Sequence, residues 1–156
     1  MLPHLLTLEQ LRILSTQESL SMPQLEQLFA TLRSSDEEVR AWTSDILQGV
    51  SAPPEELVPQ LQIFTTDHAP AIAGWACKLL SRTQHTSSAS ISALKNALSN
   101  YPELSVRELA AMALGNCQEI SSDALLALKQ AASATEYPRL ARLASAAIAQ
   151  HYSMSK

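Results

Sequence analysis

One nine-residue pattern occurs four times in this sequence at nearly constant spacing, and it constrains the fold more than any other feature. The copies begin at Val39, Ile72, Val106 and Leu140, so the intervals are 33, 34 and 34 residues. In every copy the first, fourth, fifth, eighth and ninth positions are apolar or small. This spacing marks one face of an amphipathic helix. Four copies at one period predict a repeat protein whose units bury their apolar faces against each other.

Two positions of the pattern predict how the helices pack. The fifth position is small in all four copies, which permits close approach of a neighbouring backbone: Thr43, Ala76, Ala110 and Ala144. The fourth position holds large apolar side chains: Trp42, Trp75, Leu109 and Leu143. We expect the two tryptophans to belong to the core between repeats; a partner-binding aromatic pair is the alternative. Gly74 interrupts a predicted helix beside Trp75, where we expect local crowding rather than a hinge.

A second series of apolar helices alternates with the first. The predicted helices span residues 7–16, 22–33, 36–48, 54–65, 70–83, 88–98, 103–116, 122–133 and 137–151. Good helix formers dominate the composition and only 4% of the residues are aromatic, which argues against β-structure. We therefore expect an all-α fold with a single domain over residues 1–156. Its repeats are expected near residues 1–34, 35–67, 68–100 and 101–134, followed by a final helix over 135–152.

The predicted helices carry start and stop signals. Residues 7–10, 21–24 and 35–38 fit the capping box, in which two side chains bind backbone amides reciprocally. Prolines stand near four predicted first turns, where a missing backbone N–H has no cost: Pro23, Pro54, Pro70 and Pro138. Gly49 and Gly115 follow helices of the repeated pattern, and we expect left-handed caps there.

The chain is acidic, and its charge is unevenly distributed. It has 11 Lys and Arg residues against 15 Asp and Glu residues, for a net charge of −4. Residues 1–78 carry a net charge of −6 and residues 79–156 a net charge of +2. The sequence lacks a basic stripe of the kind that binds phosphates, which argues against a nucleic-acid partner. Cys77 and Cys117 lie in apolar stretches without a CxxC motif, so we expect buried thiols in a soluble cytoplasmic protein.

The best copies of the pattern resemble HEAT repeats. Residues 36–41, Asp-Glu-Glu-Val-Arg-Ala, and residues 104–115, Leu-Ser-Val-Arg-Glu-Leu-Ala-Ala-Met-Ala-Leu-Gly, are similar to the first helix of that family's repeat. The copies that begin at Ile72 and Leu140 keep the apolar positions but lack the Val-Arg pair and the glycine. Armadillo and other helical-hairpin solenoids are alternatives. The resemblance implies a right-handed α–α superhelix of about four repeats with roughly nine helices.

The resemblance also implies where a partner binds. In HEAT-like proteins the second helix of each repeat usually lines the concave side, so its exposed residues are candidate contacts. In this sequence these candidates are Gln24, Gln27, Thr31, Glu56, Gln60, Lys95, Lys129 and Gln130. Arg40 and Arg107 share a position that commonly ties one repeat to the next through an acidic neighbour such as Asp45. We expect that structural role for both arginines.

The sequence lacks recognisable motifs for catalysis or metal binding. The histidines are far apart and form no HExxH motif or Cys/His cluster: His4, His68, His85 and His151. We expect Asp67 to cap a helix, and the pairs Glu37-Glu38 and Glu55-Glu56 to stabilise helix first turns rather than to act as acid and base. We therefore expect no metal and no cofactor.

Two functions from different classes fit these features. The first is a non-enzymatic interaction or scaffold module that binds a protein or peptide through the solenoid surface. The alternative is a HEAT-like lyase or an enzyme-accessory subunit related to the phycobilin lyases, although no motif supports it. Tyr101 and Tyr137 precede prolines in successive turns and are expected to form a small ridge. The final helix is not followed by a hairpin partner, so we expect a monomer, or a weak dimer through that helix.

Overall fold

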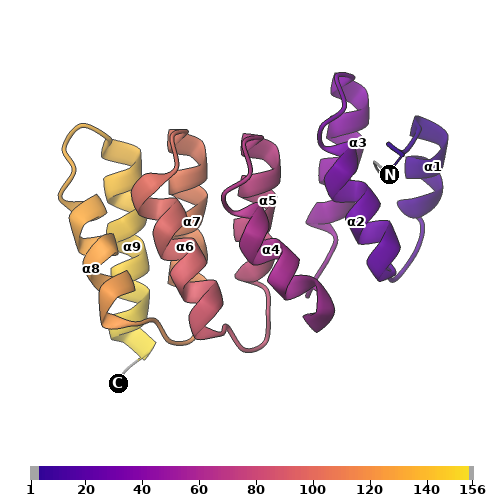
Figure 1. The fold of residues 1–156 in the computed structure, drawn as a ribbon. Helices are drawn as coiled ribbons and strands as arrows, with labels where there is room; N and C mark the ends of the chain where they lie inside the picture. Colours follow the sequence, from indigo (N-terminus) through magenta and orange to yellow (C-terminus); the bar gives the residue numbers. More distant parts are fainter. Residues whose placement is uncertain (1–3, 155–156) are drawn as a thin grey trace. The chain divides into compact units, whose positions relative to one another are not determined.

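The computed structural model describes residues 4–154, and these residues form an all-α fold (Figure 1). Within them there are nine α-helices, one short 3₁₀ helix and no strand. The helices are α1 (Leu8–Leu14), α2 (Met22–Thr31), α3 (Glu37–Gln48), η1 (Glu55–Leu57), α4 (Val58–Phe64), α5 (Pro70–Leu80), α6 (Ser88–Asn100), α7 (Leu104–Asn116), α8 (Ser122–Ala132) and α9 (Pro138–Met154). Every predicted helix is confirmed, with ends shifted by a few residues. None of the helices described is long and apolar enough to cross a membrane.

The helices group into two compact units, which divide between Leu57 and Val58. Unit 1 contains α1, α2, α3 and η1, and both α1 and α2 pack against α3. Unit 2 contains α4 to α9 in two layers, with α5, α7 and α9 in one layer and α4, α6 and α8 in the other (Figure 1). This layering is that of stacked helical hairpins, the solenoid architecture that the repeat predicts.

The most extensively packed consecutive helices of unit 2 are α4 with α5, α6 with α7, and α8 with α9. The repeated nine-residue pattern therefore lies in the second helix of each packed pair and not in the first. Helix α9 packs against both α8 and α7, so the expectation that it lacks a hairpin partner is wrong. The physical reason is that a period fixes the length of a repeat, whereas tertiary packing decides which two helices form one pair.

The repeated apolar positions form the core. The first-position residues are all buried: Val39, Ile72, Val106 and Leu140. The small fifth-position residues have no exposed surface: Thr43, Ala76, Ala110 and Ala144 (0% each). The fourth position is mixed, because Trp75 is buried whereas Trp42, Leu109 and Leu143 are half-buried. The predicted core role of the tryptophans is therefore confirmed for Trp75 and only partly for Trp42.

Two glycines permit close approach of neighbouring helices. A Cβ atom at Gly74 would lie 2.9 Å from Cδ1 of Leu109, so the site is crowded by a side chain of α7. A Cβ atom at Gly115, inside α7, would lie 3.0 Å from both Cα and Cβ of Ala147 in α9. No glycine in the described range has a positive φ, so the predicted left-handed caps are wrong. At Gly49 the chain leaves α3 in the right-handed region, with φ −77° and ψ −9°.

The helix starts follow the capping signals with one exception. The capping boxes at Thr7 and Ser21 are confirmed, and each side chain accepts a hydrogen bond from the third helical amide. The box predicted over residues 35–38 is wrong, because Asp36 is the N-cap of α3 and its carboxylate accepts from two amides. A carboxylate is a stronger acceptor than a serine hydroxyl. Asp67 accepts from the amide of Ala69 at 2.8 Å and so caps the turn that leads into α5.

Candidate partner-binding surfaces

The outer face of the α4–α6–α8 layer holds four of the predicted partner contacts. Three of them are exposed and one is half-buried: Gln60, Lys129 and Gln130, and Lys95. Lys95 and Lys129 directly follow Leu94 and Leu128, which are fully buried. The two lysines therefore occupy equivalent positions of neighbouring helices, and they place positive charge on this face.

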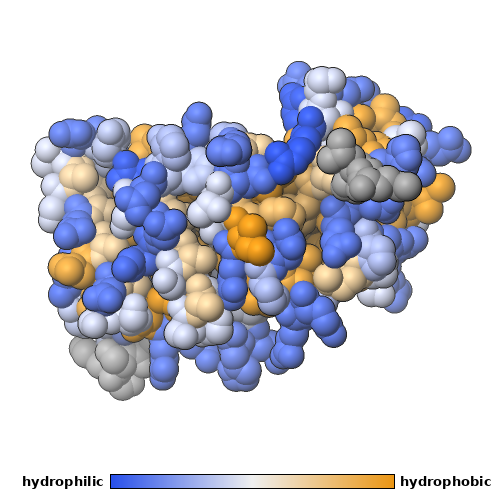
Figure 2. All heavy atoms as spheres, viewed as in Figure 1, coloured by the Kyte–Doolittle hydropathy of each residue, from blue (hydrophilic) through white to orange (hydrophobic). Residues whose placement is uncertain are grey.

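The same layer exposes two large apolar side chains. Ile63 of α4 is 64% exposed and Leu126 of α8 is 55% exposed. In Figure 2 the surface over these helices mixes hydrophilic residues with scattered hydrophobic ones. Apolar, cationic and amide side chains together can supply the apolar contacts and hydrogen bonds of a protein interface.

A polar contact joins two helices of this layer. Gln62 Nε2 in α4 donates to Ser90 Oγ at 3.0 Å and to Ser87 Oγ at 3.5 Å. Ser87 is also the N-cap of α6 and accepts from the amide of Ser90. One side chain of α4 is therefore held at the start of α6, which stiffens the surface that the layer presents.

The predicted contacts in unit 1 do not form a comparable surface. Thr31 is fully buried, so the expectation that it is exposed is wrong. Its hydroxyl donates to the carbonyl of Gln27 at 2.6 Å and accepts from the amide of Leu6 at 3.0 Å. Gln24 is half-buried and serves the capping box of α2, Gln27 is half-buried, and Glu56 is exposed in η1. The sequence shows that Thr31 is polar, but it does not show that the hydroxyl finds hydrogen-bond partners inside the fold.

The two repeated arginines tie each helix to the helix before it. Arg40 Nη1 donates to the carbonyl of Ser34 at 2.7 Å, and Arg107 Nε donates to the carbonyl of Leu98 at 2.9 Å. Both arginines have a structural role, but the expected tie between repeats through an acidic neighbour is wrong: each bond lies within one helix pair, α2–α3 or α6–α7, and goes to a backbone carbonyl at or just after the end of the first helix rather than to Asp45. Such carbonyls have no partner within their own helix.

A hollow of about 420 Å³ lies between the α4–α5 and α6–α7 turns of unit 2. Tyr101 Oη joins the two turns by donating to the carbonyl of Asp67 at 2.6 Å, and within α6 Asn100 Nδ2 donates to Asn96 Oδ1 at 2.7 Å. Burial raises the pKa of Tyr101, and the carboxylates of Asp67 and Glu103 raise it further. Tyr101 thus links successive turns instead of standing free as part of a ridge.

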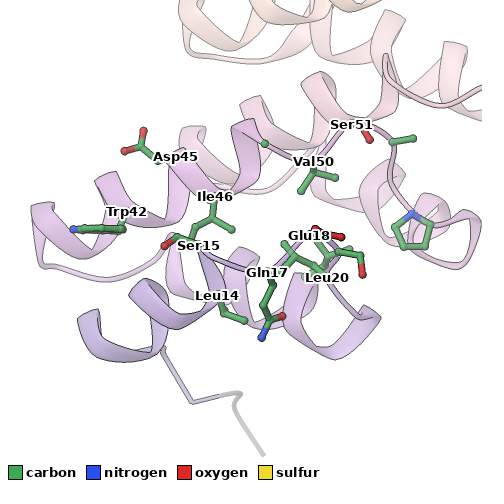
Figure 3. A pocket seen from close by; sticks show the side chains of 15 residues that line it. Leu14, Ser15, Gln17, Glu18, Leu20, Trp42, Asp45, Ile46, Val50 and Ser51 are labelled. Carbon is green, nitrogen blue, oxygen red and sulfur yellow. The ribbon is translucent and has the colours of Figure 1, made fainter.

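A second cavity of about 310 Å³ lies within unit 1, between the α1–α2 loop and the end of α3 (Figure 3). Its apolar lining includes Leu14 of α1, Leu20 of the α1–α2 loop, Trp42 and Ile46 of α3, and Val50 of the loop after α3. Its charged lining consists of Glu18 and Asp45. The sequence does not reveal this cavity, because loop residues that converge in space leave no periodic pattern.

Residues 4–154 contain no group of three or more His, Cys, Asp or Glu side chains that could hold a metal ion. Cys77 and Cys117 are free and buried, as predicted. Burial raises the pKa of Cys77 to about 12 and also raises that of Cys117, so both are protonated thiols at neutral pH.

Stacked helical pairs with buried small residues between them define the class of α-helical repeat proteins. Comparison with protein-family profiles matches residues 25–115 to HEAT repeats. The chain belongs to the HEAT-repeat family. The match begins within α2 and ends within α7, so it covers the consecutive pairs α2–α3, α4–α5 and α6–α7. No curated protein and no solved structure matches the chain.

Proposed function

We propose that this protein is a non-enzymatic interaction or scaffold module of the cytoplasm, which binds a protein or peptide through the outer face of α4, α6 and α8. HEAT repeats generally mediate protein–protein interaction. The observation that carries the choice of face is that Ile63, Leu126 and Lys129 are all exposed on the same helix layer. Residues Gln60, Lys95 and Gln130 supply polar contacts around them.

Three further properties belong to the same proposal. Residues 1–156 act as one repeat domain. The protein is a monomer, or a weak dimer through the terminal helix α9. Its exposed residues Ser145, Ala149 and Tyr152 offer a small surface for such a contact.

The test is affinity capture of the tagged protein from its native lysate, followed by mass spectrometry and absorbance of the eluate. The variant Ile63→Ser/Leu126→Ser/Lys129→Glu changes the proposed face. We expect it to lose a stoichiometric partner that the wild-type protein retains, because exposed apolar anchors and charges set affinity.

A matched control changes the other layer of unit 2 in the same way. Met112 is 45% exposed and Arg142 is an exposed cation, so the control is Met112→Ser/Arg142→Glu. The control should keep the partner. Loss from the control alone would contradict the choice of face. A chromophore or small molecule that copurifies without any protein would contradict the scaffold function and support the lyase or enzyme-accessory alternative.

A further inference from the structure

We propose that the cavity of unit 1 binds a lysine or arginine side chain carried by an apolar segment of a partner protein. This inference rests on the proposed interaction function and adds a site that lies outside the α4–α6–α8 face. The cavity is formed by Leu14 and Ser15 at the end of α1, by the α1–α2 loop, by α3 and by the loop that follows it.

The cavity has an apolar base of the size of a side-chain pocket. Leu14, Leu25 and Ile46 line it and are buried in the core of unit 1, with 7%, 1% and 8% of their surface exposed. Trp42 is half-buried and forms part of the wall (Figure 3). The volume of about 310 Å³ is at the small end of the range for ligand pockets, about 300–1,000 Å³. A peptide side chain with an apolar neighbour fits this size better than a large ligand does.

The charge of the site selects a cation. Glu18 and Asp45 are the charged residues of the lining, and neither makes an ion pair with another residue in the range 4–154. Residues 1–57 carry nine acidic and three basic side chains, a net charge of −6. The field of the whole unit therefore attracts a basic segment; Glu18 lies where it can bind the cation directly, and Asp45 adds negative charge from the Trp42 side of the cavity (Figure 3).

The end of α3 adds to this preference. Gly49, the C-cap residue of α3, lines the cavity. The last carbonyl groups of a helix carry partial negative charge and favour a cation nearby. Helix α3 has no basic residue in its last turn to neutralise this end, whereas α1 has Arg12 in its own last turn.

The contact of Trp42 with Arg12 indicates where in the cavity the partner's cation binds. The guanidinium carbon of Arg12 lies 5.9 Å from the centre of the Trp42 ring, within the range of a cation–π contact. The Trp42 ring therefore already holds a cation of the protein itself, although Arg12 is not part of the cavity lining. Figure 3 shows Glu18 near Leu20, on the side of the cavity away from Trp42. We place the partner's cation at Glu18 and its apolar neighbour against Leu20 and Val50.

The test uses immobilised five-residue peptides of the form Ser-Φ-X-Φ-Ser, where Φ is Leu, Ile, Val, Phe or Met and X is Arg, Lys, Gln or Glu. Peptides that bind the full-length protein are sequenced, and their affinities are measured by fluorescence anisotropy. We expect enrichment of Arg and Lys at X. We expect Glu18→Lys/Asp45→Lys to weaken the selected peptides by about tenfold or more, since it reverses both charges of the site.

The matched control is Glu26→Lys/Glu119→Lys, which makes the same change of net charge at two exposed residues outside the cavity lining. It should bind the peptides nearly as well as the wild-type protein, and circular dichroism should show unchanged helix content in both variants. The proposal is overturned if Arg and Lys are not enriched, or if the selected peptides bind both variants equally well.

Sedimentation velocity tests whether a second copy of this chain, instead of a partner peptide, occupies the cavity. A wild-type dimer that becomes monomeric in Glu18→Lys/Asp45→Lys would mean that a second copy of this chain fills the cavity, and the partner-peptide proposal would be wrong. The proposed function is tested by a different experiment, in which the Ile63→Ser/Leu126→Ser/Lys129→Glu variant should lose the captured partner. Failure of the cavity proposal therefore leaves the scaffold proposal testable on its own.

Discussion

The substitution Gly115→Ala tests the close packing of α7 against α9. The new methyl carbon would lie 3.0 Å from Cα and Cβ of Ala147, whereas carbon atoms at optimal contact are about 3.5–4.0 Å apart. Because Cα belongs to the backbone, the two helices must move apart, and overpacking of this kind costs about 1–3 kcal/mol. Alanine gains about 1 kcal/mol over glycine in helix propensity. The free energy of unfolding should therefore fall by about 1 kcal/mol, and by no more than about 2 kcal/mol.

The matched control is Gly74→Ala in α5. Its methyl carbon would lie 2.9 Å from Cδ1 of Leu109, the far end of a half-buried side chain that can rotate away. The propensity gain is the same, so the free energy of unfolding should stay unchanged or rise by up to about 1 kcal/mol. Urea denaturation followed by circular dichroism gives both values. If Gly115→Ala is as stable as Gly74→Ala, the close approach of α7 and α9 is wrong.

Three further predictions test other parts of the structure. Thr31→Val removes the acceptor for the buried amide of Leu6 and should cost about 1–3 kcal/mol in urea denaturation, whereas a neutral effect would contradict that hydrogen bond. Burial raises the pKa of Cys77 from 9.0 to about 12, so iodoacetamide at pH 8 should label it only after unfolding; labelling of the native protein would contradict its burial. Since the folded pKa is the higher one, the contribution of Cys77 to stability is complete below pH 9 and is lost as the pH rises towards 12. Trp42 lies in unit 1 and Trp75 in unit 2, so each of the variants Trp42→Phe and Trp75→Phe keeps one fluorescent probe, in the other unit. If the chain unfolds as one cooperative domain, the fluorescence transition of each variant should coincide with its circular-dichroism transition. A separate early transition would contradict a single domain.

The fold could be predicted because its causes are local and repeated. Apolar residues at helical spacing specify each helix, and the small residues from Thr43 to Ala144 at one fixed position show where helices approach. Capping signals at Thr7 and Ser21 fixed two helix starts, because these hydrogen bonds form within four residues. Each of these features depends on neighbours in the sequence.

What could not be predicted depends on contacts between distant residues. The pairing of α8 with α9 follows from tertiary packing, and so does the role of Gly115, which faces Ala147 rather than capping a helix. The polarity of Thr31 predicts a surface position, because its hydrogen-bond partner, the amide of Leu6, is 25 residues away and leaves no local signal. The unit 1 cavity arises where two loops meet the ends of α1 and α3, and the sequence gives no signal for it.

Site-specific photocrosslinking tests most directly whether a protein partner binds the outer face of α4, α6 and α8. Benzoylphenylalanine replaces Gln60 in α4, Gln130 in α8, or Met112 in α7, all of which are exposed. Each protein is irradiated with the captured partner at a concentration that saturates binding. Binding through this face predicts covalent adducts from positions 60 and 130 and none from position 112. Adducts from position 112 alone, or from none of the three positions while the partner is bound, would contradict it.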